Sequence, residues 1–341
     1  MKEKITQGDI AKKLNLSVTT VSRALQNDPV INPETRAEVL NMAAQLNYRP
    51  RQNRQLHSRS EEKRSHQFVC VIVKMPVEQD AWAPDEVASG YLAGMSEVCA
   101  SLNVSLVVHH VSDENVHGLL NEEEQPPIFN DPNLMGVVLI HFFPHDVVKA
   151  LSEKLPIVAI VHDVPELKID LIDMDNHQAT DELVKKLIRR GHKKIGFMGY
   201  RPNLSWSRSR LGGYLQAMFT SGLHVDESLI AGEANDQLVV DKLKEGVTAW
   251  VCSVDVVAYE LCRKLLDRGV KIPEQVSITG FNDVKPLLNC PKLTSIQPPL
   301  KEMGVAALHR LMIRVDEPLS QSIKILHRCK LTVGATTGDF K

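Results

Sequence analysis

The sequence predicts a small all-α helix-turn-helix domain, followed by a larger α/β body that contains two doubly wound parallel sheets. Two observations lead to this fold class. The first 48 residues carry helix-start signals and apolar residues at three- and four-residue spacing, which is typical of short helices. From residue 68 onward, short runs rich in β-branched residues alternate with helical patterns, and this βαβ order favours parallel sheets covered by helices.

Each of the three helices expected at the N-terminus begins at a capping residue. Thr6, with Asp9 three residues later, forms a capping-box pattern for the first helix. After a tight turn, Ser17 can cap a second helix that runs from residue 18 to about residue 26. Asn32, with a proline directly after it, opens the third helix. The unit is assigned to residues 1–50.

The segment 51–67, RQNRQLHSRSEEKRSHQ, is almost wholly polar and has no apolar periodicity, so we expect a hinge or linker. The body then covers residues 68–341. Its expected strands are 68–73, 104–108, 136–142, 157–161, 195–198, 248–252 and 277–281. We place the boundary between the two sheets near residues 164–170. One subdomain is thus expected at 68–165 with 298–325, and the other at 166–297 with 326–341.

Composition and charge narrow the function classes. Residues 1–66 hold 12 Lys+Arg and 7 Asp+Glu, a balance of +5, whereas the whole chain carries a net charge of -2. A basic start on an acidic body indicates that the first part binds a polyanion. The apolar runs are far shorter than the roughly 20 residues of a membrane helix. The N-terminus does not resemble a signal peptide, so we expect a cytoplasmic protein.

The six cysteines are widely spaced and form no CxxC or Cys/His pattern that could hold zinc. We therefore expect buried, reduced thiols, and neither a metal site nor a cofactor. Sequence patterns for common catalytic sites, such as GxSxG, HExxH, GxxxxGK[ST] and GxGxxG, are also absent. The sequence gives little support to an enzyme.

A block of residues at fixed spacing in the N-terminal unit resembles a known family. The block consists of Asp9-Ile10-Ala11, Leu16-Ser17, Thr20-Val21-Ser22-Arg23, Thr35-Arg36, Val39 and Leu46-Asn47-Tyr48 with Pro50. It is similar to the start of the lactose-repressor (LacI/GalR) family of transcriptional regulators. In the body, residues 173–176, 190–199, 207–214, 269–283 and 293–298 continue the likeness. The resemblance implies a periplasmic-binding-protein-like type I body with three crossovers, a ligand in the cleft, and a homodimer on palindromic operator DNA.

The resemblance also assigns DNA-contacting residues. Short hydroxyl or amide side chains at helix starts suit phosphate oxygens, and these are Ser17, Thr20, Ser22, Asn32 and Thr35. For Ser17 a pure N-cap role is an equal alternative. The base-contacting positions of the family are occupied by Val18, Thr19 and Arg23, of which Arg23 can bond guanine bidentately.

The linker departs from the family pattern. Arg51 and Arg54 favour the phosphate backbone. Arg54, however, replaces the alanine of the family's hinge helix, and Leu56 stands one residue before the leucine that enters the minor groove. A minor-groove hinge helix with Leu56 as its wedge and a linker without one both stay open.

Effector-binding residues follow from the resemblance and from position. Arg210, Asn176 and Gln297 match cleft-facing positions of the family and are expected to converge on the ligand. Other candidates depart from the pattern or rest on their place at the carboxyl ends of strands, where such folds bind ligands. They are Trp82, Asp163, Asp255, Trp206 and Asn282. Asp163 can instead cap a turn. The expected effector is a sugar or sugar derivative.

The function predicted from the sequence is a sequence-specific DNA-binding repressor whose operator affinity is modulated by a small molecule. Three alternatives are weighed against it. A regulator controlled by a protein partner would keep DNA binding but lose the effector. A sugar-binding transport protein would need export, which the sequence does not favour, and an enzyme would need a catalytic pattern.

Overall fold

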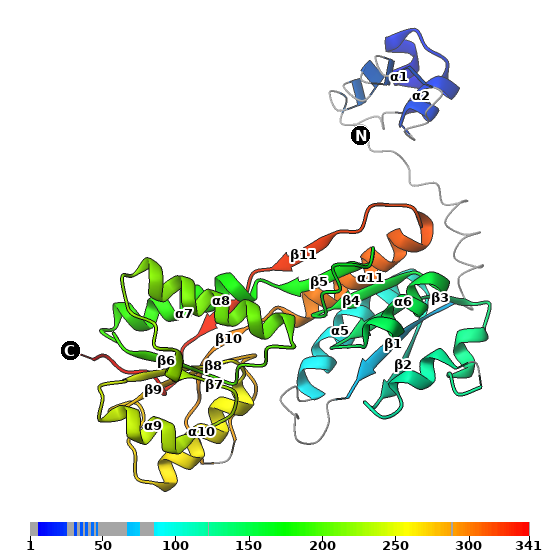
Figure 1. The fold of residues 1–341 in the computed structure, drawn as a ribbon. Helices are drawn as coiled ribbons and strands as arrows, with labels where there is room; N and C mark the ends of the chain where they lie inside the picture. Colours follow the sequence, from blue (N-terminus) through cyan, green and yellow to red (C-terminus); the bar gives the residue numbers. More distant parts are fainter. Residues whose placement is uncertain are drawn as a thin grey trace. The chain divides into compact units, whose positions relative to one another are not determined.

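In the computed structural model, the described residues are 6–25, 31–32, 35–36, 38–39, 42–43, 46, 67–75, 85–121, 123–287 and 289–340. The chain divides into two compact units, residues 1–62 and 63–341 (Figure 1). Each unit is described by itself. Within the described residues no helix combines the length and the apolar character that crossing a membrane requires.

The N-terminal unit begins with two short helices, α1 (Gln7–Leu14) and α2 (Val18–Leu25). The capping box at the start of α1 is confirmed, because the Thr6 backbone N–H donates to Asp9 Oδ2 at 2.8 Å. Asn15 ends α1 in the left-handed conformation, with φ of 55°. The described positions of the third expected helix, among residues 35–43, are helical. The buried side chains that hold the unit together are Ile10, Ala11, Val21, Ala24, Val39 and Ala43.

The first sheet of the body has six parallel strands in the order β11-β5-β4-β3-β1-β2. Their bounds are Phe68–Lys74 (β1), Ser105–Val111 (β2), Leu134–Ile140 (β3), Ile157–Ile160 (β4), Asp170–Met174 (β5) and Lys324–His327 (β11). The central strands are buried on both faces. Alternate residues of β1 point to opposite sides, with Val71 in the cluster that α5 and α11 cover and Ile72 in the cluster that α6 covers.

The second sheet has the order β12-β10-β9-β8-β6-β7. Its strands are Ile195–Met198 (β6), Ile230–Ala231 (β7), Ala249–Cys252 (β8), Ser277–Phe281 (β9), Thr294–Gln297 (β10) and Lys330–Thr332 (β12). Four of the pairs are parallel, and β12 runs antiparallel to β10. The sequence had predicted only parallel strands, so the antiparallel edge is a correction. Trp250 in β8 is fully buried and belongs to the core of this subdomain.

Helices cover both faces of each sheet, as Figure 1 shows. Those of the first sheet are α5 (Asp85–Leu102), α6 (His145–Lys154) and α11 (Leu300–Asp316). Those of the second are α7 (Asn176–Arg189), α8 (Ser205–Thr220), α9 (Asp236–Leu243) and α10 (Asp255–Asp267). Short 3-10 helices lie at Val116–Leu120 (η2), Pro127–Asn130 (η3) and Glu227–Leu229 (η4).

The chain passes between the two sheets three times. It crosses after β5, between β10 and α11, and between β11 and β12. These three crossings are what the resemblance implied. Three segments therefore connect the two subdomains, and a movement of one subdomain relative to the other changes the conformation of all three.

The predicted subdomain boundaries are wrong by several residues. Both β5 and β11 lie in the first sheet, so the chain leaves that sheet after Met174 and again after His327. The sequence hides β5 because the strand begins with a charged residue, Asp170. The structure buries this carboxylate completely, and Arg314 Nη2 donates to Asp170 Oδ2 at 2.7 Å. Arg310 lies against the same oxygen, with its Nε at 3.0 Å.

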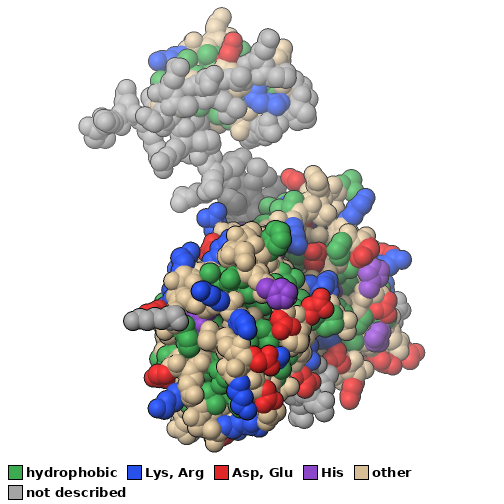
Figure 2. Space-filling view, turned by 60° about the vertical axis from the view of Figure 1, so that its left-hand side comes forward, with side chains coloured by type: hydrophobic (Ala, Val, Ile, Leu, Met, Phe, Trp, Pro, Cys, Tyr) green, Lys and Arg blue, Asp and Glu red, His purple; other side chains and the backbone are tan. Residues whose placement is uncertain are grey.

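All six cysteines are free thiols. Four of them are buried, whereas Cys290 and Cys329 are only half-buried. The expectation of buried thiols therefore holds for four positions. On the face of the body that Figure 2 shows, acidic and basic side chains are interspersed over the surface.

Candidate functional site

The outward face of α2 is the first candidate site. Ser17 Oγ accepts a hydrogen bond from the Thr20 backbone N–H at 3.0 Å and lies 2.8 Å from Thr20 Oγ1, so Ser17 caps α2 as predicted. Val18 is 51% exposed, and Thr19 and Arg23 are exposed beside it. The opposite face of the helix is buried. An exposed β-branched side chain next to an arginine, on a helix of a compact unit, forms a surface that a groove of DNA can cover.

The remaining candidates of this unit have mixed outcomes. Ser22 and Thr35 are half-buried and Asn32 is exposed. The Arg36 backbone N–H donates to Asn32 O at 3.0 Å, which places Asn32 at the start of the third helix. Arg51, Arg54 and Leu56 lie outside the described residues. The expectation of a hinge helix concerns the same segment and stays a prediction.

The second candidate site is the cleft between the two sheets. Its walls come from the carboxyl ends of strands of both sheets, together with α5, α8 and the start of α10. Two adjoining hollows, of about 20 and 30 Å³, lie there. Trp206 lines both of them, and Arg210 and Asn282 line the larger one. The cleft therefore collects three of the predicted residues, and Trp82 lies outside the described residues.

Arg210 is fixed in the cleft by contacts on all sides. Its Nε donates to Asn176 Oδ1 at 2.8 Å, and its Nη1 donates to Ser253 O at 2.5 Å. The guanidinium carbon lies 3.4 Å from the Phe281 ring centroid and 4.6 Å from that of Trp206, so the cation is held between two aromatic rings. Burial lowers the pKa of Arg210 to about 10, which leaves it charged at neutral pH.

Two carboxylates lie close to this cation. Burial raises the pKa of Asp173 to about 6, although its Oδ1 accepts from the Met174 backbone N–H at 2.8 Å. Burial also raises the pKa of Asp255 to about 6. Asp255 accepts from Ser295 Oγ at 2.6 Å and from the Val284 backbone N–H at 2.8 Å, so it holds the loop after β9 in place.

Several cleft residues have a strained backbone. Val161, a β-branched residue, has φ of 58°, and His141 has φ of 76°. Asn282 has φ of 113°, and its backbone N–H donates to Ile296 O at 2.8 Å. Residues with a Cβ rarely adopt positive φ, and such strain gathers at ligand sites. Here all three follow the carboxyl ends of strands and line the hollows.

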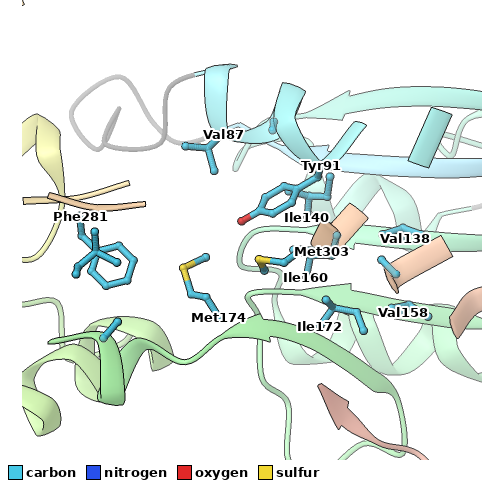
Figure 3. Close-up of a cluster of buried hydrophobic side chains, with 14 of the residues drawn as sticks. Val87, Tyr91, Val138, Ile140, Val158, Ile160, Ile172, Met174, Phe281 and Met303 are labelled. Carbon is cyan, nitrogen blue, oxygen red and sulfur yellow. The ribbon is translucent and has the colours of Figure 1, made fainter. Parts of the chain in front are cut away.

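Sequence reasoning missed two buried polar groups of the cleft. Tyr91 Oη and His162 Nε2 are buried and have no hydrogen-bond partner among the described residues. In Figure 3 the Tyr91 ring extends from α5 toward Met174, with its hydroxyl oxygen on the side of Phe281. Burial lowers the pKa of His162 to about 4, so the ring is neutral and donates toward the Phe143 backbone. Its free Nε2 is then an acceptor.

Two predicted residues lie apart from this group. Gln297 is exposed, and its Nε2 donates to Asp283 Oδ2 at 3.1 Å, so the structure does not bring it to Arg210. Asp163 Oδ2 accepts from Lys324 Nζ at 2.8 Å and lines neither hollow. Trp206 is the second residue of α8, and its ring lies against the Arg210 guanidinium.

His192 follows the end of α7 and lies outside the cleft hollows. Gly191 follows α7 with φ of 96°, and the His192 backbone N–H returns to Leu187 O at 3.2 Å. The imidazole is buried, its Nδ1 lies 2.8 Å from Thr248 Oγ1, and burial lowers its pKa. It joins two segments of the second subdomain and does not line the cleft hollows.

Two family models match the chain, one in each of its compact units. The family described as "Bacterial regulatory proteins, lacI family" matches residues 6–51, and the "Periplasmic binding protein-like domain" matches residues 184–337. The chain is 27% identical to the HTH-type transcriptional repressor CytR of Escherichia coli over 347 residues, which is 97% of this chain and 96% of that one. It is 25% identical to the probable HTH-type transcriptional repressor ExuR of Bacillus subtilis, over 96% and 97% of the two chains.

Solved structures show the same fold. A complex of the transcriptional regulator CelR with cellobiose superimposes with a TM-score of 0.68 at 20% identity, covering 97% of this chain and 99% of that one. A lac repressor dimer bound to operator superimposes with a TM-score of 0.61, also at 20% identity, over 98% and 100% of the chains.

Proposed function

Because the chain belongs to the LacI family of bacterial transcriptional regulators, we propose that it binds a palindromic operator as a homodimer. Its affinity for this operator falls or rises when a small polar molecule fills the cleft. The outward face of α2 carries the DNA-binding part. Val18, Thr19 and Arg23 are exposed on the helix that the family places in the major groove. Chromosomal DNA as the target places its action in the cytoplasm.

The unpartnered polar groups of the cleft support the effector part. A buried hydroxyl or imidazole nitrogen without a partner costs about 1 to 3 kcal/mol, so a protein keeps one where a ligand supplies the bond. Tyr91 Oη can donate or accept, whereas the neutral His162 Nε2 accepts. Sugar hydroxyls meet both needs, and the Trp206 ring offers an apolar face. The cellobiose in the CelR complex supports the same ligand class.

The size of the hollows supports control by opening and closing. With about 20 and 30 Å³, they hold about one or two water molecules each. Ligand sites commonly measure about 300 to 1,000 Å³. A sugar can therefore enter only when the subdomains move apart, and its unequal affinity for the two arrangements shifts the population.

The DNA-binding part is tested by selecting DNA from a pool of random duplexes with the full chain. We expect a palindrome whose half-sites lie about one helical turn apart. Affinity for it should fall steeply with salt, because neutralised phosphates release counterions. Selection of no palindrome, or affinity that does not change with salt, would contradict the proposal.

The effector part is tested by titrating the full chain with single neutral mono- and disaccharides in a calorimeter. A carbohydrate that binds should also change the affinity for the selected palindrome. If none binds while operator binding is intact, control by a protein partner becomes the better account.

A further inference from the structure

A hollow larger than the two of the cleft lies outside the cleft. It measures about 500 Å³ and opens on the second subdomain, between α7, the edge strand β12 and its neighbour β10. This size falls in the range of small-molecule sites. We call it the α7 groove. No step of the proposed function uses it.

The floor of the α7 groove is apolar. Ile296 in β10 and Leu331 in β12 are directly opposed in the antiparallel ladder, so their side chains lie on the same face. Cys329, two residues before Leu331, also lines the groove. Burial raises the pKa of Cys329 to about 12, so it stays a neutral thiol and adds to the apolar surface.

The wall opposite this floor is cationic. Lys186 and Arg189, in the last turn of α7, and Arg190, which directly follows the helix, line the groove. Arg190 is held in place, since its Nη1 donates to Thr337 O and Oγ1, both at 2.9 Å.

The charges of this wall are only partly neutralised. Arg190 Nε lies 3.0 Å from Asp339 Oδ1. In the described residues, Lys186 and Arg189 have no ion pair or hydrogen bond from their side chains. Glu182 is the single acidic residue of the lining, and its Oε1 accepts from Gln178 Nε2 at 2.9 Å. An excess of positive charge therefore faces an apolar floor.

We propose that the α7 groove is a second small-molecule site, which binds an organic anion with an apolar body. A carboxylate or phosphate group would pair with Lys186 and Arg189, and the apolar part would cover Ile296 and Leu331. The site borders both α7, whose first residue Asn176 bonds Arg210, and the segment that crosses from β11 to β12. An occupant would thus touch two elements that connect the subdomains.

The test uses octanoate and octylammonium, which share an apolar body and differ in charge, in separate titrations of the full chain followed by calorimetry. We expect one octanoate per chain and about tenfold weaker binding of octylammonium. The double variant Lys186→Glu with Arg189→Glu should lose octanoate binding by about tenfold or more. Leu331→Ser should also weaken octanoate binding, because it makes the apolar floor polar without changing the net charge.

The control is Lys193→Glu with Lys244→Glu, which changes the net charge equally on residues that do not line the groove. Octanoate binding should survive in it. Equal loss in both double variants would show general charge attraction and overturn the site. Absence of octanoate binding to the unaltered chain would also overturn it, and the cations would then serve only to complement the carboxyl end of α7. Neither result bears on operator or sugar binding.

Discussion

At the scale of single residues, Arg23 and Thr35 are expected to serve DNA binding in different ways. Arg23 is exposed on α2, and an arginine there can bond a guanine edge. We predict that Arg23→Ala costs about 1 to 3 kcal/mol at the selected operator and relaxes preference at one base pair. Thr35→Ala should weaken all duplexes alike, because phosphate contacts carry no sequence information.

Fluorescence anisotropy with the operator, single-base variants of it and a random duplex separates these two roles. The ratio of the affinity for the operator to the affinity for the random duplex should be the same in the unaltered chain and in Thr35→Ala. In Arg23→Ala this ratio should be smaller. Equal loss on all duplexes for Arg23→Ala would remove it from base recognition and leave it a phosphate contact.

Asp173 gives a prediction about pH. Burial holds its folded-state pKa at about 6, above the ordinary aspartate value of 3.8. The folded state therefore favours the protonated carboxyl. This contribution to stability is complete below about pH 4 and is lost as the pH rises through 6. An asparagine does not ionise, so the stability of Asp173→Asn does not fall in this way as the pH rises. The free energy of unfolding of the variant minus that of the unaltered chain should therefore be larger at pH 7 than at pH 4, by roughly 3 kcal/mol at most.

Urea denaturation of the body at a series of pH values measures this difference. The gain from Asp173→Asn should grow between about pH 4 and pH 6 and stay level above that range. A difference between the two chains that is constant with pH would mean that the carboxylate is stabilised in its charged form, and that its contact with Arg210 outweighs burial.

At the scale of elements, the packing of α5 against α11 positions Tyr91. A Cβ at Gly94 in α5 would lie 2.0 Å from Lys301 O, and one at Gly304 in α11 would lie 2.0 Å from Tyr91 O. Real Cβ atoms do not approach backbone so closely, so the two helices touch through their backbones. This contact fixes the depth at which the Tyr91 ring enters the cleft.

We predict that Gly94→Ala destabilises the body by about 1 to 3 kcal/mol, because the helices must separate. In an exposed helix the same change would stabilise by about 1 kcal/mol. Ser96→Ala, at an exposed position of α5, is the matched control and should change the free energy of unfolding little. Chemical denaturation measures both. A stable Gly94→Ala variant would show that α5 and α11 are free to adjust.

The sequence predicted the elements that are continuous apolar runs and missed those that are not. Seven expected strands are found within a few residues of their places, from β1 to β9. β5 was missed because Asp170 is neutralised by arginines of α11, over 130 residues further along the chain. β11 and β12, at the edges of their sheets, contain only exposed and half-buried residues, which gives a weak pattern.

The candidate site could be predicted only in part, for a physical reason. Arg210 and Asn176 were found because the resemblance marks their positions, and they bond each other. Tyr91 and His162 were missed, because an unpartnered polar atom is a property of the folded environment and not of a motif. From the sequence, a tyrosine on an apolar helix face is predicted to be a core residue. Only the folded structure shows that Tyr91 lines a hollow.

At the scale of the whole molecule, the cleft and the face of α2 that we propose contacts DNA belong to separate compact units. The cleft residues Arg210 and Asn176 both come from the second subdomain, whereas Tyr91 and His162 come from the first. A ligand that bonds all four joins the two subdomains in one arrangement. The ligand can then change the affinity for the operator by no more than the ratio of its own affinities for the joined and the separated arrangements.

The last prediction separates effector binding from operator binding. Arg210→Ala removes a charged donor from the cleft and should lower the affinity for the carbohydrate found by calorimetry by about tenfold or more. Operator affinity without effector should change little, because Arg210 bonds only within the body. His162→Ala is a second variant, which removes an acceptor without removing a cation from between Phe281 and Trp206, and it should weaken effector binding in the same direction. Circular dichroism establishes that each variant is folded. Unaltered effector affinity in both folded variants would place the ligand elsewhere, and loss of operator affinity in folded Arg210→Ala would mean that the arrangement of the subdomains depends on this side chain even without a ligand.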